Sequence, residues 1–455
     1  MATTSAIKRM AILLYKIIHN TVSVDNVSVG KYTKKLYVAG SDSSMTITQP
    51  GALPLSMGAD PNAKLGPSFY IVDDGYDAMN HFYEEINQDA IVRTKVGRKA
   101  VEEAIVALVR KHENGDKPKQ NALEVESRSL LATLHALVEE RQATVPIENL
   151  VLSGMDELMV GKVMFRSRSK TMPLLQEKLS EALSNKSEAD RVSTKHLFES
   201  TIFPHYNSTP TCAEVTLDAE QSRVAELVDS EVDASLNLLR CYTHLLFPRD
   251  SRAFIGLKGA VSESTRPYVD FTKDAFHVHL QKVGMFFPYE VTPDVLQNLV
   301  QYCAFNELSG VLKKQETDRT ELERVIVTAI RWLGRSITAS DVPEQVLSLA
   351  IALERLMIPD NDRSAKAESL AQRLAFLVGE DTDGRMSIFD QGKKLYRLRS
   401  DVVHDGRVQV PVADIQALET YSCLALVKMA QRLQDWQTHS DFMYWAKKQV
   451  FSVGS

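Results

Sequence analysis

The chain has 455 residues, of which 44% are hydrophobic and 25% charged, as in an ordinary globular protein with a sizeable core. Its length predicts more than one domain. The formal net charge of −6 and a pI near 6.0 exclude a protein that is basic throughout and coats nucleic acid, so any site acting on RNA must be local.

The N-terminal part alternates between helical and strand patterns. Residues 10–20 form an apolar run, interrupted by Lys16, whose spacing predicts an amphipathic helix. The run is too short to span a membrane, and no cleavage site for a signal peptide follows it, so we expect a cytoplasmic protein. Residues 34–40 and 44–50 predict strands, and residues 100–120 predict a helix that ends in a polar linker.

The middle of the chain is also mixed. Residues 127–142 predict a helix, residues 145–154 and 157–167 predict strands, and residues 218–247 predict a long helix. Four short runs separated by turns then predict one small antiparallel sheet, at residues 252–262, 266–272, 275–284 and 286–292.

No strand pattern remains after this sheet, and the C-terminal part predicts only helices. Thr320 and Glu323 have the spacing of a capping box, Pro343 suits a first helical turn, and Gly379 suits a helix C-terminus. Short connections favour antiparallel packing of neighbouring helices. Five helices are expected, at residues 320–337, 341–359, 363–381, 386–406 and 412–436.

These patterns together predict an α+β protein. We expect a mixed α/β region at 1–120, an α/β middle region with an antiparallel section at 121–314, and an all-α domain at 315–455. The four cysteines are far apart in sequence and form no C-x-x-C pair, which indicates reduced, buried thiols rather than a zinc or redox motif.

Two charged residues interrupt apolar helix faces in the last domain. On a helical wheel, Arg399 lies about 55° from the middle of an apolar stripe, and Glu354 lies within another. A charge that is removed from water must be paired, so Glu354 is the expected partner of Arg399. A structural ion pair, or an arginine that extends its head to solvent, remains the alternative to a functional role. The stripes contain Ile388, Leu395, Leu398 and Val402 on one helix, and Leu347, Ala350, Leu353 and Met357 on the other.

His404 follows Arg399 by five residues and precedes an Asp-Gly turn signal, so we expect it at the surface where the helix ends. Histidine exchanges protons near neutral pH, and arginine binds phosphate through two parallel hydrogen bonds. An Arg-x4-His spacing alone is a weak signal, because a histidine at a helix end is often only a cap.

The segment LYRLRSDVVHDG, residues 395–406, resembles the C-terminal motif of HEPN domains, particularly the ApeA-like group of prokaryotic defence proteins. VTAIRWLGRSI and SLAIALERLM resemble the first two helices of that domain, and residues 254–271 resemble the β section that often precedes it. The resemblance implies that Arg399 and His404 are catalytic, supported by Glu354, Ser400 and Asp401. Active members often carry Asn, Asp or His directly after the arginine, where this chain has Ser400.

The resemblance also implies a function. HEPN nucleases typically cut RNA without a metal or cofactor, at a site composed of two motifs across a dimer. We therefore expect an endoribonuclease for antiviral defence or toxin-like growth arrest, as a homodimer or higher oligomer, with a phage-derived or nucleic-acid trigger. The alternative is a non-catalytic HEPN module for dimerisation or nucleotide binding, with an N-terminal region that recognises a partner. The expected dimer face lies on the last two helices and includes Val402, Val403, Leu426 or Trp436, and the sequence leaves open which of these belong to the core instead.

Three further patterns have simpler interpretations. Lys162, Arg166, Arg168 and Lys170 form a basic strip that can bind phosphates, although a solvated strand end is the favoured explanation. Residues 92–100 form a second basic patch of the same kind. His277 and His279 would share one face of a strand, but no third metal ligand is evident, so no metal site is predicted.

Overall fold

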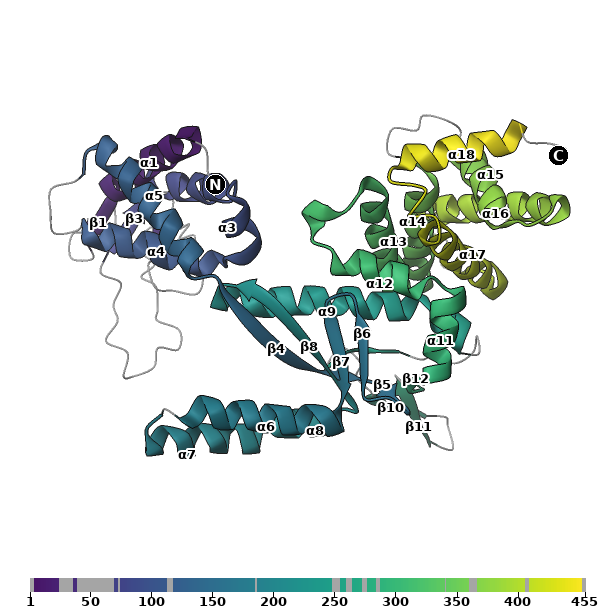
Figure 1. Cartoon of the computed structure of the whole chain (residues 1–455), viewed down its shortest axis with the longest axis horizontal. Coiled ribbons are helices and arrows are strands. Elements are labelled where there is room, and N and C mark those ends of the chain that lie inside the picture. Colours follow the sequence, from purple (N-terminus) through teal and green to yellow (C-terminus); the bar gives the residue numbers. More distant parts are fainter. Residues whose placement is uncertain are drawn as a thin grey trace. The chain divides into compact units, whose positions relative to one another are not determined.

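The chain divides into two compact units, shown with the path of the chain in Figure 1. Unit 1 consists of Met1–Arg141 and Leu217–Leu227, and unit 2 consists of Gln142–Thr216 and Val228–Ser455. The computed structural model describes residues 4–23, 36–38, 69–72, 74–112, 118–184, 186–247, 254–258, 264–271, 276–283, 287–339, 341–359, 366–405 and 409–451.

Unit 1 is mostly helical. The N-terminal apolar run is confirmed as a helix, and its residues Met10, Leu14 and Ile17 are fully buried because they recur every three or four positions. The helices are α1 (Thr4–His19), α2 (Asp74–Ile86), α3 (Ala90–Lys95), α4 (Arg98–Lys111) and α5 (Gln120–Ala136). Helices α2 and α5 both pack against α1.

A three-stranded antiparallel sheet completes unit 1 in the order β1-β3-β2. Its strands are β1 (Thr21–Ser23), β2 (Leu36–Val38) and β3 (Phe69–Val72). The strand predicted at 34–40 contains β2, whereas the one predicted at 44–50 lies outside the described residues.

The helix predicted at 127–142 is wrong at both ends. Helix α5 begins earlier, at Gln120, and ends at Ala136, and Glu139 opens strand β4 (Glu139–Glu148). Glu, Arg and Gln favour helices, but the pairing of β4 within a sheet outweighs that local preference. The predicted boundary at 120/121 falls directly after the first residue of α5, and this helix belongs to unit 1 in the structure.

Unit 2 contains a five-stranded sheet in the order β6-β7-β8-β4-β9. Strands β6 and β7 form a hairpin at Gly161, whose φ of 60° favours glycine. A Cβ at Gly161 would also lie 2.9 Å from Leu312 Cβ, so the turn has no room for a side chain. Besides β4, the strands are β6 (Glu157–Val160), β7 (Val163–Ser167), β8 (Thr211–Ala219) and β9 (Gly256–Leu257).

The four runs predicted as one small antiparallel sheet do form strands, but these strands belong to three different sheets. The first contributes β9 to the five-stranded sheet, and the next two form an antiparallel hairpin of β10 (Ser264–Phe271) and β11 (Phe276–Val283). The last contributes β12 (Tyr289–Val291), which pairs in parallel with β5 (Leu150–Leu152). Alternation of residue types indicated strands, but it did not indicate their partners.

The long helix predicted at 218–247 also begins too early. Strand β8 continues to Ala219, and α9 extends over Val224–Cys241. The break lies at Glu220, whose side chain accepts hydrogen bonds from the Gly97 and Ser222 amides and closes a turn there. The other helices before residue 315 are α6 (Arg168–Ser184), α7 (Glu188–Leu197), α8 (Phe203–Asn207), α10 (Thr243–Leu246), α11 (Pro293–Tyr302) and α12 (Phe305–Lys313).

The C-terminal part is helical in its described residues, as predicted, and its predicted caps are confirmed. Thr320 and Glu323 form a reciprocal capping box, and Asp341 caps the next helix ahead of Pro343. A sixth helix, α18, was not predicted, and α17 ends six residues before Trp436. The helices are α13 (Glu321–Ile337), α14 (Val342–Met357), α15 (Lys366–Val378), α16 (Thr382–Asp405), α17 (Val412–Ala430) and α18 (His439–Phe451).

The packing of these helices positions α16. Helix α16 lies against α15 and α14, and α17 packs against α13, α14 and α15. Gly392 allows the close approach of α16 to α15, because a Cβ there would lie 3.0 Å from Ala371 Cα. None of the helices in the described part of the chain combines the length and apolar composition needed to cross a bilayer.

Candidate functional site

Arg399 lies on α16 and faces Glu354 on α14. Its Nε is 3.3 Å from Glu354 Oε1, and 31% of the arginine side chain and 21% of the glutamate side chain remain exposed. Neither of these two atoms makes a hydrogen bond of good geometry, so the contact is an ion pair at close range. The predicted pairing is confirmed, and the Arg399 side chain keeps part of its surface exposed.

The helical wheel explains why Arg399 lies there. Leu395, Leu398 and Val402 of the predicted apolar stripe of α16 are buried, and Ile388, its first residue, is half-buried. Arg399 directly follows Leu398 and is one turn beyond Leu395, so its side chain emerges at the edge of the buried face. On α14, Leu353 is buried and Glu354 is half-buried beside it.

His404 is exposed in the last turn of α16, as predicted. Ser400 and Asp401 are half-buried between the arginine and the histidine. Residues 406–408, which follow the helix, lie outside the described part of the chain.

One chain does not bring Arg399 and His404 together. On an ideal helix, five residues separate two side chains by about 7.5 Å along the axis and by about 140° around it. No hydrogen bond or ion pair joins the two side chains within the residues that the structure describes. A single chain therefore offers one cationic anion-binding group and one separate proton-transfer group.

Three of the four residues considered for a dimer face belong to the core instead. Val402, Leu426 and Trp436 are buried in the core of unit 2, because helix packing in this domain covers them. Val403 alone of the four is exposed, with 45% of its surface accessible, and it directly precedes His404.

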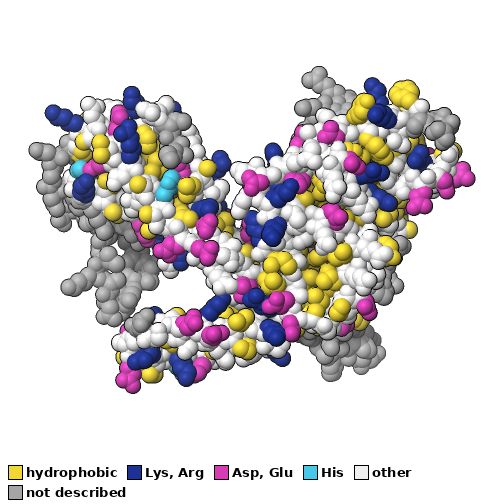
Figure 2. Space-filling model, viewed as in Figure 1, with side chains coloured by type: hydrophobic (Ala, Val, Ile, Leu, Met, Phe, Trp, Pro, Cys, Tyr) yellow, Lys and Arg dark blue, Asp and Glu magenta, His cyan; other side chains and the backbone are white. Residues whose placement is uncertain are grey.

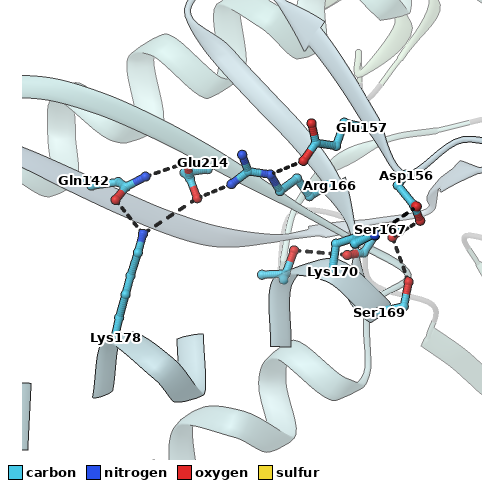
Figure 3. A network of polar contacts seen from close by, with 10 residues as sticks. Gln142, Asp156, Glu157, Arg166, Ser167, Ser169, Lys170, Lys178 and Glu214 are labelled. Carbon is cyan, nitrogen blue, oxygen red and sulfur yellow. Dashed lines mark hydrogen bonds and ion pairs between the residues drawn. The ribbon is translucent and has the colours of Figure 1, made fainter. Parts of the chain in front are cut away.

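The basic strip at residues 162–170 is neutralised by carboxylates. Arg166 binds Glu157 at 2.8 Å and Glu214 at 2.6 Å, and Lys178 reaches Glu214 from α6 at 3.9 Å (Figure 3). Partial burial lowers the pKa of Arg166, but its hydrogen bond to Glu157 and the charge of Glu214 outweigh this effect and raise the pKa overall.

The other members of this strip are engaged as well. Lys162 pairs with Glu231 at 2.8 Å, and Lys170 lies 3.5 Å from Asp156. Arg168 donates to the Asn207 carbonyl. The strip therefore forms a polar network between the strands of the sheet and the adjacent helices. Most of its positive charge is compensated by carboxylates, so little remains to bind the phosphates of a nucleic acid.

Carboxylates also accompany the second basic patch, at residues 92–100. Lys95 pairs with Asp218 at 2.9 Å, and Arg98 pairs with Glu102 at 3.0 Å while its guanidinium lies over the Tyr83 ring. These contacts account for much of the positive charge of the patch within unit 1.

All four cysteines are free thiols, and Cys212, Cys241 and Cys423 are buried, as predicted. Burial raises the pKa of Cys212 to about 11 and that of Cys423 to about 12. The thiolate is the reactive form of cysteine, so these two residues are unreactive near neutral pH.

His277 and His279 both lie on β11, opposite Asp270 and Tyr268 of β10, which confirms the predicted strand. Their side chains lie outside what the structure describes. Among the described residues, no three histidine, cysteine or acidic side chains gather in a way that could hold a metal ion.

Sequence reasoning missed one surface feature, a groove between α15 and the unpredicted helix α18. Its signal in the sequence is the alternation of aromatic residues and lysines in YWAKKQVF, residues 444–451. No family model matches the chain, and neither a curated protein nor a solved structure is significantly similar to it.

Proposed function

We propose that the chain is a cytoplasmic endoribonuclease of the HEPN type, which cuts RNA without a metal ion and acts in antiviral defence or toxin-like growth arrest. The observation that carries the proposal is the arrangement on α16. Arg399 Nε lies 3.3 Å from Glu354 Oε1 while 31% of the arginine side chain is exposed, and His404 is exposed in the last turn of the same helix.

These residues match the chemistry of RNA cleavage. The 2′-hydroxyl of RNA attacks the adjacent phosphorus, and the bond to the 5′-oxygen of the next nucleotide breaks. The reaction needs a base that accepts the hydroxyl proton, an acid that protonates the leaving oxygen, and positive charge near the pentavalent phosphorus. Histidine can serve as base or acid, and Arg399 is a permanent cation suited to the phosphate oxygens.

A pair of chains completes the set of groups. One chain supplies only His404 as a surface histidine of this motif, whereas the reaction uses a base and an acid. A two-fold axis near the end of α16 would place a second His404 and a second Arg399 at the same phosphate. The N-terminal region would then sense the trigger or restrain the nuclease.

The test is cleavage of labelled RNA by the purified full-length chain in the presence of EDTA. Arg399→Ala and His404→Ala should each reduce the cleavage rate by at least about 100-fold, the usual contribution of a general acid or base. Arg397→Ala and His196→Ala are matched controls, because both residues are exposed and neither belongs to the Arg399–His404 pair. Full activity of a folded His404→Ala protein would overturn the proposal.

One observation favours a non-catalytic HEPN module instead. Ser400 occupies the position where active members of the family often carry Asn, Asp or His, and it is half-buried in the structure. Such a module would dimerise or bind a nucleotide without cutting RNA. The same assay distinguishes the two functions, because the module would show no cleavage that depends on Arg399 or His404.

A further inference from the structure

A groove of about 360 Å³ lies between α15 and α18 in unit 2. No aspartate or glutamate is present among the described residues that line it. Its walls combine apolar surface with two cationic side chains, and they include Phe376, Met443, Ala446 and Val450 together with Arg373 and Lys447.

The outer face of α18, beside the groove, also combines apolar and cationic side chains. Lys447, Lys448 and Phe451 follow Tyr444 by three, four and seven residues, which places them on one side of the helix. Tyr444 is 63% exposed and Phe451 is 77% exposed. Figure 2 shows hydrophobic and basic side chains next to one another over this part of unit 2.

The lysines and aromatic rings of this face lie close together. Lys448 Nζ lies 4.5 Å from the centroid of the Tyr444 ring, as in a cation–π contact. Acidic groups of the same two helices have other partners. Asp441 accepts hydrogen bonds from the Gln437 and Thr438 amides, and Glu368 lies 3.9 Å from Lys393. The surface therefore presents positive charge beside exposed rings.

We propose that this α15–α18 surface, defined by the groove and by Tyr444, Lys447, Lys448 and Phe451, binds single-stranded RNA. Unpaired bases stack on Tyr444 and Phe451, and the phosphates between them lie against Lys447 and Lys448. The inference rests on the proposed function, which makes RNA the ligand of the chain, and it identifies a surface that holds the substrate outside the Arg399–His404 motif.

Physical chemistry favours single-stranded RNA over other polyanions. Proteins that bind single strands combine a positively charged groove with aromatic side chains, because every unpaired base has a face that can stack. A duplex conceals those faces within its own stack, and an acidic peptide has carboxylates without bases. The two rings are about 10.5 Å apart along α18, far enough for each to take a different base.

The experiment measures RNA binding separately from cleavage. The full-length chain carrying His404→Ala is titrated into a fluorescein-labelled 12-nucleotide single-stranded RNA, and binding is followed by fluorescence anisotropy. Adding Tyr444→Ala or Phe451→Ala should weaken binding about tenfold each, the usual effect of losing one stacking ring. Tyr302→Ala is the matched control, because Tyr302 on α11 is 62% exposed, and it should leave the affinity unchanged.

The lysines are tested through the dependence of binding on salt. Replacing both Lys447 and Lys448 by glutamine should reduce the slope of log Kd against log salt by about 1.4, because each phosphate contact to a single strand contributes about 0.7. Lys313→Gln, at an exposed site on α12, should leave the slope unchanged.

Competition identifies the ligand class. Unlabelled single-stranded RNA should displace the probe at lower concentration than double-stranded RNA or polyglutamate. Displacement by polyglutamate at equal concentration, or unchanged affinity after loss of both rings, would overturn the inference. The protein could bind RNA through Tyr444 and Phe451 and yet show no nuclease activity. That result would support the α15–α18 surface as an RNA-binding site and would refute the proposed cleavage.

Discussion

Arg397 and Arg399 lie two residues apart on α16, yet their surroundings differ. Arg397 is exposed, whereas Arg399 is half-buried and lies 3.3 Å from Glu354. The helical wheel predicts this difference, because Arg399 is next to the buried Leu398 and Arg397 points away from the stripe. The proposed role of Arg399 in binding phosphate therefore depends on its position on the helix as much as on its charge.

Glu354 should stabilise the fold as well as orient Arg399. Glu354→Gln removes the charge but keeps the shape, so the melting temperature of unit 2 should fall by only a few degrees, since a partly exposed ion pair contributes about 1 kcal/mol. The RNA cleavage rate should fall further than that of an equally destabilised control. Calorimetry and the EDTA cleavage assay measure the two effects, and an unchanged melting curve would argue against the pairing.

At the scale of elements, close packing against α15 positions α16. Gly392 faces Ala371 Cα at a distance that leaves no space for a side chain, whereas a Cβ added at Gly310 on α12 would meet no neighbouring atom within 4 Å. Both glycines lie within helices, but only Gly392 is required by its surroundings, because a neighbouring helix leaves no space for a side chain there.

Gly392→Ala and Gly310→Ala should change stability in opposite directions. Alanine favours a helix over glycine by up to about 1 kcal/mol, so Gly310→Ala should stabilise the protein. At Gly392 the added methyl group meets backbone atoms of α15, and overpacking of this kind costs typically about 1–3 kcal/mol. Denaturant unfolding followed by tryptophan fluorescence compares them, and stabilisation by both changes would contradict the close contact.

Three carboxylates connect the helices of unit 1. Asp89 caps α3 and binds His135 of α5, Glu126 binds Lys111 and His112 at the end of α4, and Glu220 accepts from the Gly97 amide before α4. Burial disfavours the charged form of each carboxylate, but these hydrogen bonds outweigh burial, and the pKa of all three is lowered.

Unit 1 should therefore lose stability in acid. Groups whose pKa is lowered by folding stabilise the protein above their unfolded pKa, which is about 4, and this stabilisation is lost as the pH falls through the folded value. All three tryptophans, Trp332, Trp436 and Trp445, lie in unit 2. Below about pH 4, far-UV circular dichroism should thus change before tryptophan fluorescence does. Asp89→Asn should reduce that difference, and simultaneous transitions in the native protein would contradict the assignment.

At the scale of the whole molecule, the proposed nuclease site needs a second copy of the chain. Three of the four residues expected at the dimer face belong to the core, and Val403 remains as the exposed apolar neighbour of His404. An exposed valine alone is ordinary, so its place beside the motif is what makes it informative.

Val403→Asp should therefore dissociate the proposed dimer into monomers, and RNA cleavage should be lost at the same time. Light scattering measures the mass, and the EDTA assay measures the rate at several protein concentrations. Val192→Asp is the control, because Val192 on α7 is exposed and lies on another part of unit 2. A strictly monomeric protein that cuts RNA at the native rate would contradict the shared site.

The sequence alone determined the features that depend on neighbours along the chain. The capping box at Thr320, the cap ahead of Pro343 and the burial of Leu395 and Leu398 follow from spacing within single helices, and the structure confirms them. The edge position of Arg399 has the same origin. Only these local regularities can be deduced from one sequence without knowledge of distant contacts.

The tertiary structure decided what depends on distant partners. Strand β12 pairs in parallel with β5, about 140 residues earlier in the chain. Residues 139–148 form a strand because they pair with the neighbouring strands of the five-stranded sheet. The burial of Leu426 and Trp436 and the groove between α15 and α18 likewise arise where separate helices meet. Hydrophobicity indicates that a side chain seeks burial, but the packing of distant elements decides which apolar residues are covered and which remain available to a partner.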